Sequence, residues 1–368
     1  MRSGWISSVL VGALGSRRAL TGGLYPPQGV PIPPVNAPVS RTGYRRVMHI
    51  STRVSASIFL TILVISACSA PSPATPSPSP AAAGYPGWPG GSEPLDPPEV
   101  IPLLISNDLA AGPNRFVFSL LDRQNELIAG PDVSAGVSFY DLAADPATPV
   151  TTQESRFQWT VEGELGAYVS SVDFPRAGDW GVEVTVERPD MPATTTRAVF
   201  PVRTESAAPG IGERVPASDT PTAVTLDEAR TISTDTDPNL DFYRLSVADA
   251  LEAGKPFLVI FSTPAFCRTR TCGPALDIVK DVAADYEGAE VNFLHVEPYQ
   301  LEAVDGHLQP VVGEGGQPLI VPSMGPDEWN LPTEPYVAVV GEDGTLRAKF
   351  EGVAGEEELR AAIDDVLG

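Results

Sequence analysis

The 368-residue sequence is poor in the residue types that usually build catalytic and metal centres, with only three cysteines and three histidines. It contains no phosphate-binding glycine loop, no cysteine and histidine spacing typical of a zinc finger, and no Ser, His and Asp in an order typical of a catalytic triad. Basic residues are also scarce, because 24 Lys and Arg stand against 47 Asp and Glu and give a formal net charge of −23. A surface this acidic repels phosphate backbones and anionic lipid headgroups, so we expect no nucleic-acid partner.

The few basic residues gather at the N-terminus, where residues 1–67 hold seven arginines and no lysine, Asp or Glu. Residues 48–67 have the layout of an export signal peptide, with a polar, basic start followed by an apolar run, 56–65, that is short for a membrane span. This layout favours Met48 as the true start, with residues 1–47 untranslated. The alternative is that residues 1–47 form a disordered extension.

The apolar run ends in Ile65-Ser66-Ala67-Cys68, which resembles the lipoprotein box of bacteria, in which the cysteine is lipidated and becomes the new N-terminus. Residues 68–99 follow and are rich in Pro and Ser, a composition typical of a tether. The alternative for Cys68 is an ordinary buried or free cysteine after an uncleaved anchor. Either interpretation predicts an exported, extracytoplasmic protein at the cell membrane, whose two other cysteines meet an oxidising environment.

Short alternating runs between turn signals fill residues 100–204 and predict an antiparallel β-sandwich. Residues 166–184 resemble the late strands of small, immunoglobulin-like (Ig-like) extracytoplasmic domains of bacteria. We expect Tyr168 and Trp180 in the core. Residues 100–204 contain no histidine and one methionine, Met191, so we expect this domain to be a spacer or partner-docking module with no metal role.

A polar, turn-rich stretch, 205–245, predicts a linker before a second domain at 246–368. In that domain Ser246 and Gly254 predict the two caps of a short helix. The other expected elements, with an irregular insertion at 298–330, are strands at 257–261, 291–296, 336–340 and 345–350 and helices at 274–286 and 356–367.

This order resembles the α/β fold of thioredoxin-like domains, and three places carry the resemblance. The apolar strand 257–261 leads to Cys272-Gly273-Pro274 at a helix start, Pro335 matches the cis-proline of that family, and residues 342–352 match its final hairpin. The resemblance covers about a third of the chain. It implies thiol–disulfide oxidoreductase activity on thiols and disulfides of envelope proteins, with a role in cell redox homeostasis and no cofactor.

The cysteine spacing departs from the C-x-x-C of that family, because Cys267 and Cys272 form a C-x4-C pair. Gly-Pro directly after Cys272 favours a helix start there, where the helix dipole stabilises a thiolate, so Cys272 is the preferred attacking sulfur and Cys267 the resolving one. Alignment from the strand end makes Cys267 the first cysteine instead, and the sequence does not decide. A purely structural disulfide in a non-catalytic adaptor is a further alternative.

A copper-binding chaperone is the remaining alternative, because two cysteines and a distant histidine also resemble the copper-delivery members of the thioredoxin-like class. Cys267, Cys272 and His295 would be the ligands, and Cu(I) favours such soft donors. For His295, at a strand end, the competing interpretation is a polar side chain with local hydrogen bonds.

Overall fold

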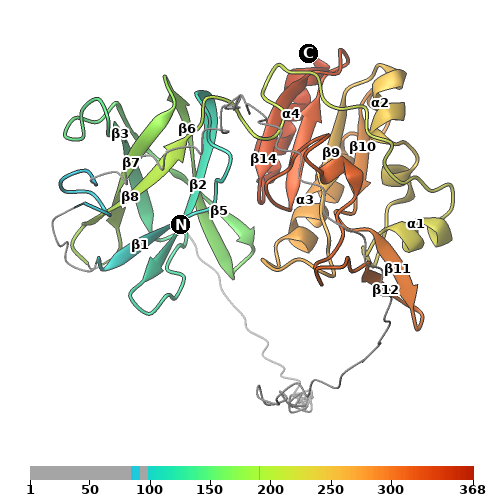
Figure 1. The fold of residues 1–368 in the computed structure, drawn as a ribbon, viewed down its shortest axis with the longest axis horizontal. Helices are drawn as coiled ribbons and strands as arrows, with labels where there is room; N and C mark the ends of the chain where they lie inside the picture. Colours follow the sequence, from blue (N-terminus) through green and yellow to red (C-terminus); the bar gives the residue numbers. More distant parts are fainter. Residues whose placement is uncertain (1–83, 92–97, 190) are drawn as a thin grey trace, which may run out of the picture. The chain divides into compact units, whose positions relative to one another are not determined.

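The computed structural model describes residues 84–91, 98–189 and 191–368, all within one compact unit, Ala74–Gly368 (Figure 1). Cys68 and the signal peptide expected in residues 48–67 lie outside the described residues. Within the described part of the chain, no helix has both the length and the apolar character needed to cross a bilayer.

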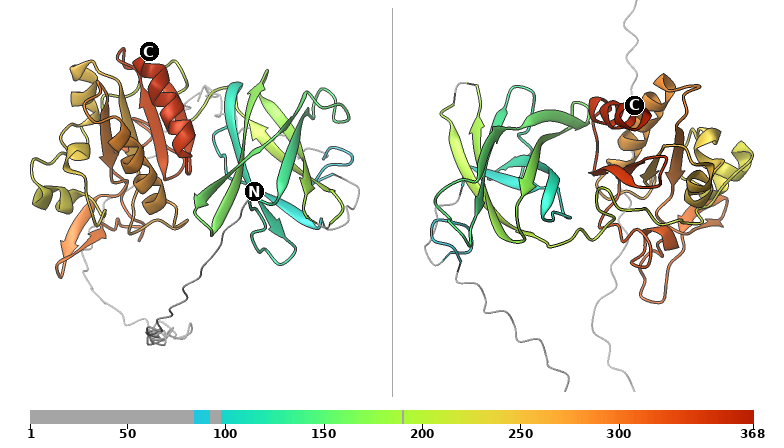
Figure 2. Two further views of the ribbon diagram at one scale, coloured as in Figure 1. Left: turned by 180° about the vertical axis from the view of Figure 1, so that it is seen from behind. Right: turned by 90° about the horizontal axis from the view of Figure 1, so that it is seen from above.

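The first part of the unit is a β-rich domain of two four-stranded antiparallel sheets (Figures 1 and 2). One sheet has the order β1-β2-β6-β5, formed by Val100–Leu104 (β1), Gly112–Asp122 (β2), Leu165–Phe174 (β6) and Arg156–Val161 (β5). The other has the order β4-β3-β7-β8, formed by Thr151–Glu154 (β4), Ser134–Asp141 (β3), Gly178–Glu187 (β7) and Thr194–Val202 (β8). Six of these strands match the alternating runs of the sequence, at 115–121, 133–140, 157–161, 167–174, 181–186 and 198–202, and β1 and β4 are additional.

One aromatic core joins the two sheets, as alternation along half-buried strands requires. The Phe116 ring of β2 meets the Phe139 ring of β3 edge-on with centroids 4.9 Å apart. Phe174 of β6 lies 4.8 Å from Trp180 of β7. Trp180 and Tyr168 are both buried, which confirms that they are core residues.

Residues 205–245 are not a simple linker, which corrects the expectation for this stretch. They form helix α1 (Leu226–Ile232) and a 3-10 turn, η1 (Leu240–Tyr243). Thr225 and Glu228 make a capping box that starts α1. Phe242 and Tyr243 are buried in the core of the C-terminal domain, so this stretch belongs to that domain.

The C-terminal domain is built on a four-stranded mixed sheet of order β10-β9-β13-β14. Its elements, in chain order, are α2 (Val247–Ala253), β9 (Phe257–Phe261), α3 (Cys272–Asp285), β10 (Asn292–Val296), β13 (Tyr336–Val340), β14 (Leu346–Glu351) and α4 (Glu356–Leu367). Strands β9 and β10 are parallel and joined through α3, whereas β13 is antiparallel to both β9 and β14. The predicted short helix is confirmed as α2, because Ser246 caps it and Gly254 ends it in the left-handed conformation.

Alternate residues of the central strands face two separate cores, so β9 and β13 are buried along their whole length. Leu258 and Ile260 face α3 and α4, which cover the same side of the sheet (Figure 2). Val259 and Phe261 face the opposite core, to which α2 and Trp329 belong. The insertion expected to be irregular contains a hairpin, β11 (Leu301–Val304) with β12 (His307–Pro310), and a 3-10 turn, η2 (Pro322–Met324).

The two domains meet through a half-buried ion pair between β2 and α4. The Arg115 guanidinium donates from Nε and Nη2 to the two oxygens of the Glu358 carboxylate, at 2.9 and 2.8 Å. Its Nη2 also donates to the Val353 carbonyl at 3.1 Å. Burial alone raises the pKa of Glu358, but the bonds from Arg115 outweigh it and hold the pKa below its usual value. The carboxylate is therefore charged when the two domains are in contact.

Candidate functional site

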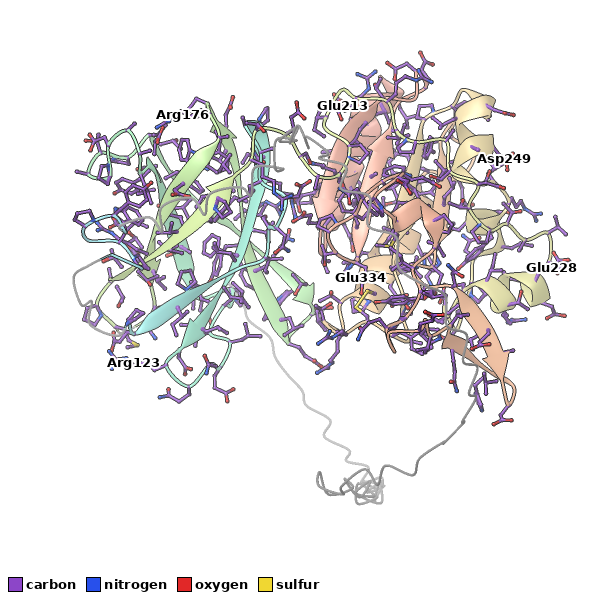
Figure 3. All side chains as sticks on the ribbon, viewed as in Figure 1. Arg123, Arg176, Glu213, Glu228, Asp249 and Glu334 are labelled. Carbon is purple, nitrogen blue, oxygen red and sulfur yellow. A yellow bond between two sulfur atoms is a disulfide. The ribbon has the colours of Figure 1, made fainter. Side chains whose placement is uncertain are left out.

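The two cysteines lie in the loop that connects β9 to α3. Strand β9 is wholly buried and ends at Phe261, and α3 begins at Cys272. The expectation of a helix start at this cysteine is confirmed. Cys267 and Cys272 form a disulfide with Cα atoms 5.9 Å apart, drawn as a yellow bond in Figure 3.

The two sulfur atoms differ in exposure and in hydrogen bonding. Cys272 is fully buried, whereas Cys267 is partly exposed. The backbone N–H of Cys272, at the N-terminus of α3, donates to the Cys267 sulfur at 3.2 Å, and the Thr269 hydroxyl lies 3.2 Å from the same sulfur. The donor and the helix dipole favour a thiolate on Cys267 after reduction. The sulfur that solvent reaches is therefore also the one that the helix start stabilises.

A turn between the cysteines carries two arginines. Arg270 adopts a left-handed backbone conformation (φ 64°), and its N–H donates to the Cys267 carbonyl at 3.3 Å. Its guanidinium pairs with Glu164, between β5 and β6 of the β-rich domain, at 2.9 Å. Both side chains are exposed, so this pair contributes little stability. It does offset the positive charge of Arg270 beside the cysteines.

Behind the loop, a buried carboxylate holds the segment that precedes Cys267. Glu297 follows β10, and its Oε2 accepts from the Thr234 N–H at 2.9 Å and from the Thr234 hydroxyl at 3.0 Å. The Thr234 hydroxyl oxygen accepts in turn from the Ala265 N–H at 3.2 Å. Burial raises the pKa of Glu297 to about 7. This carboxyl therefore changes charge near neutral pH, and two hydrogen bonds through Thr234 connect it to Ala265, which lies two residues before Cys267.

His295 is buried, and both of its ring nitrogens have partners. Nε2 lies 2.9 Å from the Ser262 carbonyl oxygen, which can only accept, so Nε2 carries the proton and Nδ1 accepts from the Tyr243 hydroxyl at 2.7 Å. Burial lowers the pKa of His295 to about 4, so the ring is neutral. In the described part of the chain, no three His, Cys, Asp or Glu side chains gather as metal ligands would. His295 is thus a buried polar side chain with local hydrogen bonds, and these contacts give no support to the copper alternative.

The Glu334–Pro335 peptide bond is cis, as the family resemblance implied. The Pro335 carbonyl accepts from the Gly352 N–H at 2.9 Å, and the Glu334 carboxylate accepts from the Tyr299 hydroxyl at 3.1 Å. In Figure 3 the label of Glu334 lies beside the disulfide, and residues of both segments line one cavity. Thr269 and Thr271, between the two cysteines, thus line the same cavity as Pro335, whereas Trp329 and Tyr336 are buried in the core.

The support that Thr234 and Tyr243 provide was not predicted from the sequence. Both lie in the stretch taken for a linker, although its capping pattern of Thr225 and Glu228 signals a helix.

Comparisons with known proteins add little. No protein-family model and no curated protein matches the chain. One solved structure, the filamin domain of Lin-41, aligns over 28% of this chain and 93% of its own, with 13% identity and a TM-score of 0.17, which is too low to support an argument.

Proposed function

We propose that the chain is an exported, lipid-anchored thiol–disulfide exchange protein of thioredoxin-like type that acts on thiols and disulfides of envelope proteins. The observation that carries the proposal is the partly exposed Cys267 sulfur, which accepts from the Cys272 N–H at the N-terminus of α3, in a loop whose Thr269 and Thr271 line a cavity together with Pro335. The β9–α3–β10 unit followed by the β13–β14 hairpin and α4 supports the thioredoxin-like assignment. The anchor and the export rest on the residues around Cys68 alone.

In the proposed exchange, the Cys267 thiolate attacks one sulfur of a substrate disulfide. A mixed disulfide forms, and the other substrate sulfur leaves as a thiolate that takes up a proton. Cys272 then loses its proton and attacks the Cys267 sulfur, which closes the intramolecular disulfide and releases the second substrate thiol. The substrate gains the two electrons that the cysteine pair loses. The reverse sequence oxidises a substrate dithiol with the same atoms.

This assignment of roles reverses the order that the sequence favoured. Cys272 is buried and is suited to the resolving step, which needs no access to substrate, whereas Cys267 is the sulfur that a substrate reaches. The local signal at Gly273-Pro274 located the helix start, but it carries no information on which sulfur the fold covers.

Trapping tests the proposal. The Cys272→Ala variant lacks the resolving sulfur and should accumulate mixed disulfides through Cys267, seen as reductant-sensitive adducts on non-reducing gels. The Cys267→Ala variant is the matched control and should trap much less, because the remaining sulfur is buried. If neither variant traps a partner and the wild-type disulfide resists dithiothreitol, the chain is an adaptor with a structural disulfide. If only Cys267→Ala traps, the roles are those expected from the sequence.

A further inference from the structure

A cavity of about 320 Å³ lies beside the disulfide loop, and the two domains line it together. From the C-terminal domain it is lined by Thr269 and Thr271, which flank the turn between the cysteines, and by Glu334 and Pro335. From the β-rich domain it is lined by residues of all four strands of the β1-β2-β6-β5 sheet and their loops, and its leucine and isoleucine side chains are Leu103, Leu104, Ile105, Leu127 and Leu165.

The chemistry of this cavity suits an uncharged, apolar group. The hydroxyls of Thr269 and Thr271 bond to each other at 2.7 Å, and the Glu334 carboxylate is held by Tyr299. The leucines still expose apolar surface to water, because Leu103 and Leu127 are 44% and 39% exposed although they line the same cavity. Covering them with an apolar group removes that surface from water, which is favourable.

The size and the position of the cavity indicate the occupant. Its volume is at the lower end of the range for small-ligand sites, so it can hold one or two side chains but no folded element. Its rim carries the turn that contains Cys267, the sulfur proposed to react. A group that enters the cavity while a sulfur of the same molecule meets Cys267 must be close to that sulfur along the chain.

We propose that the β-rich domain forms half of a substrate pocket and selects polypeptide segments that carry a large aliphatic or aromatic side chain next to the reactive cysteine. This inference rests on the proposed exchange activity. It gives the β-rich domain a role in specificity beyond that of a spacer. The pair between Arg270 and Glu164 joins the disulfide turn to the same domain.

The test uses two peptides that are identical except for Leu or Ser beside a single cysteine, and it follows their exchange with the disulfide of the full chain. The wild-type protein should react with the Leu peptide about tenfold faster, as expected from burial of one leucine side chain. The Leu103→Ser/Leu127→Ser variant should reduce this preference to less than about twofold. The readout is the ratio of the two rates within one variant, so any change in the intrinsic reactivity of the disulfide cancels.

The matched control is Val150→Ser/Met191→Ser, which removes two comparably exposed apolar side chains near the β4-β3-β7-β8 sheet. It should keep the full preference for the Leu peptide. Equal rates for both peptides with the wild-type protein would overturn the inference, and so would an unchanged preference in Leu103→Ser/Leu127→Ser. A disulfide that dithiothreitol cannot reduce would instead overturn the exchange activity itself, so the two failures are distinguishable.

Discussion

The pH dependence of stability offers a quantitative test of the buried network behind the disulfide loop, because Glu297 and His295 act in opposite directions. Burial raises the pKa of Glu297 from 4.5 to about 7, so the folded state binds its proton more tightly than the unfolded state does. The stability from this group is fully present below pH 4.5 and is lost as the pH rises through about 7, a change of ~3 kcal/mol.

His295 has the reverse sign. Burial lowers its pKa from 6.5 to about 4, so the unfolded state binds the extra proton between these values. The free energy of unfolding therefore rises by ~3 kcal/mol as the pH increases from about 4 to 6.5. In the wild-type protein the two contributions nearly cancel, and together they add little slope between pH 4.5 and 6.5.

Single substitutions should expose each slope. Relative to the wild type, Glu297→Gln should gain ~3 kcal/mol as the pH rises from 4.5 to above 7, whereas His295→Gln should lose ~3 kcal/mol between pH 4 and 6.5. Urea denaturation at each pH gives these differences, and any constant packing cost of a substitution does not affect the slope. Glu302→Gln, on the exposed hairpin strand β11, is the control and should give a flat difference. Flat differences for both test variants would refute the burial argument.

Two further predictions concern the disulfide and the ion pair between the domains. Arg115→Ala leaves the half-buried Glu358 carboxylate without its main partner, so it should lower the free energy of unfolding by ~3 kcal/mol in the same denaturation assay. Arg156→Ala removes a more exposed partner of the same carboxylate and should cost less than about 1 kcal/mol. The Cys267→Ala/Cys272→Ala variant should lose about 2 kcal/mol, because the sequence separation of 5 closes only a short loop, and the wild-type protein in reductant should lose the same amount; a much larger loss would mean that the disulfide is chiefly structural.

The sequence predicted the strands that alternate clearly or are apolar throughout. Strands β2, β3, β6 and β7 carry aromatic and branched residues on one face, and β9 is a continuous apolar run, so their periods are visible without the structure. Two edge strands, β1 and β4, were missed for a physical reason. β4 reads Thr-Thr-Gln-Glu and has no buried face, and β1 contains Pro102, which is tolerated at the edge of a sheet.

The sequence predicted the cysteine pair and the cis-proline but not the contacts around them. Cysteines are few, so the pair Cys267 and Cys272 stood out, and Pro335 followed from the family resemblance. The long-range contacts that Thr234 and Tyr243 make join residues 31 to 63 positions apart, and no local pattern encodes them. Burial of one sulfur and exposure of the other also depends on tertiary packing, which is why the order of attack could not be read from the spacing.

The longer C-x4-C spacing explains why the site draws on so many distant parts of the chain. A loop with four residues between its cysteines has more conformational freedom to lose than a C-x-x-C turn, so its geometry must be fixed from outside. Glu297 and Thr234 hold the loop before Cys267, the first turn of α3 holds its end at Cys272, and Glu164 contacts its tip at Arg270. The Glu297 carboxyl behind the loop is buried, whereas the ion pair at the tip is exposed and contributes little. The side of the loop that carries Cys267 is therefore held through a buried group, and the other side, with Thr269 and Thr271, lines the cavity proposed to receive the substrate.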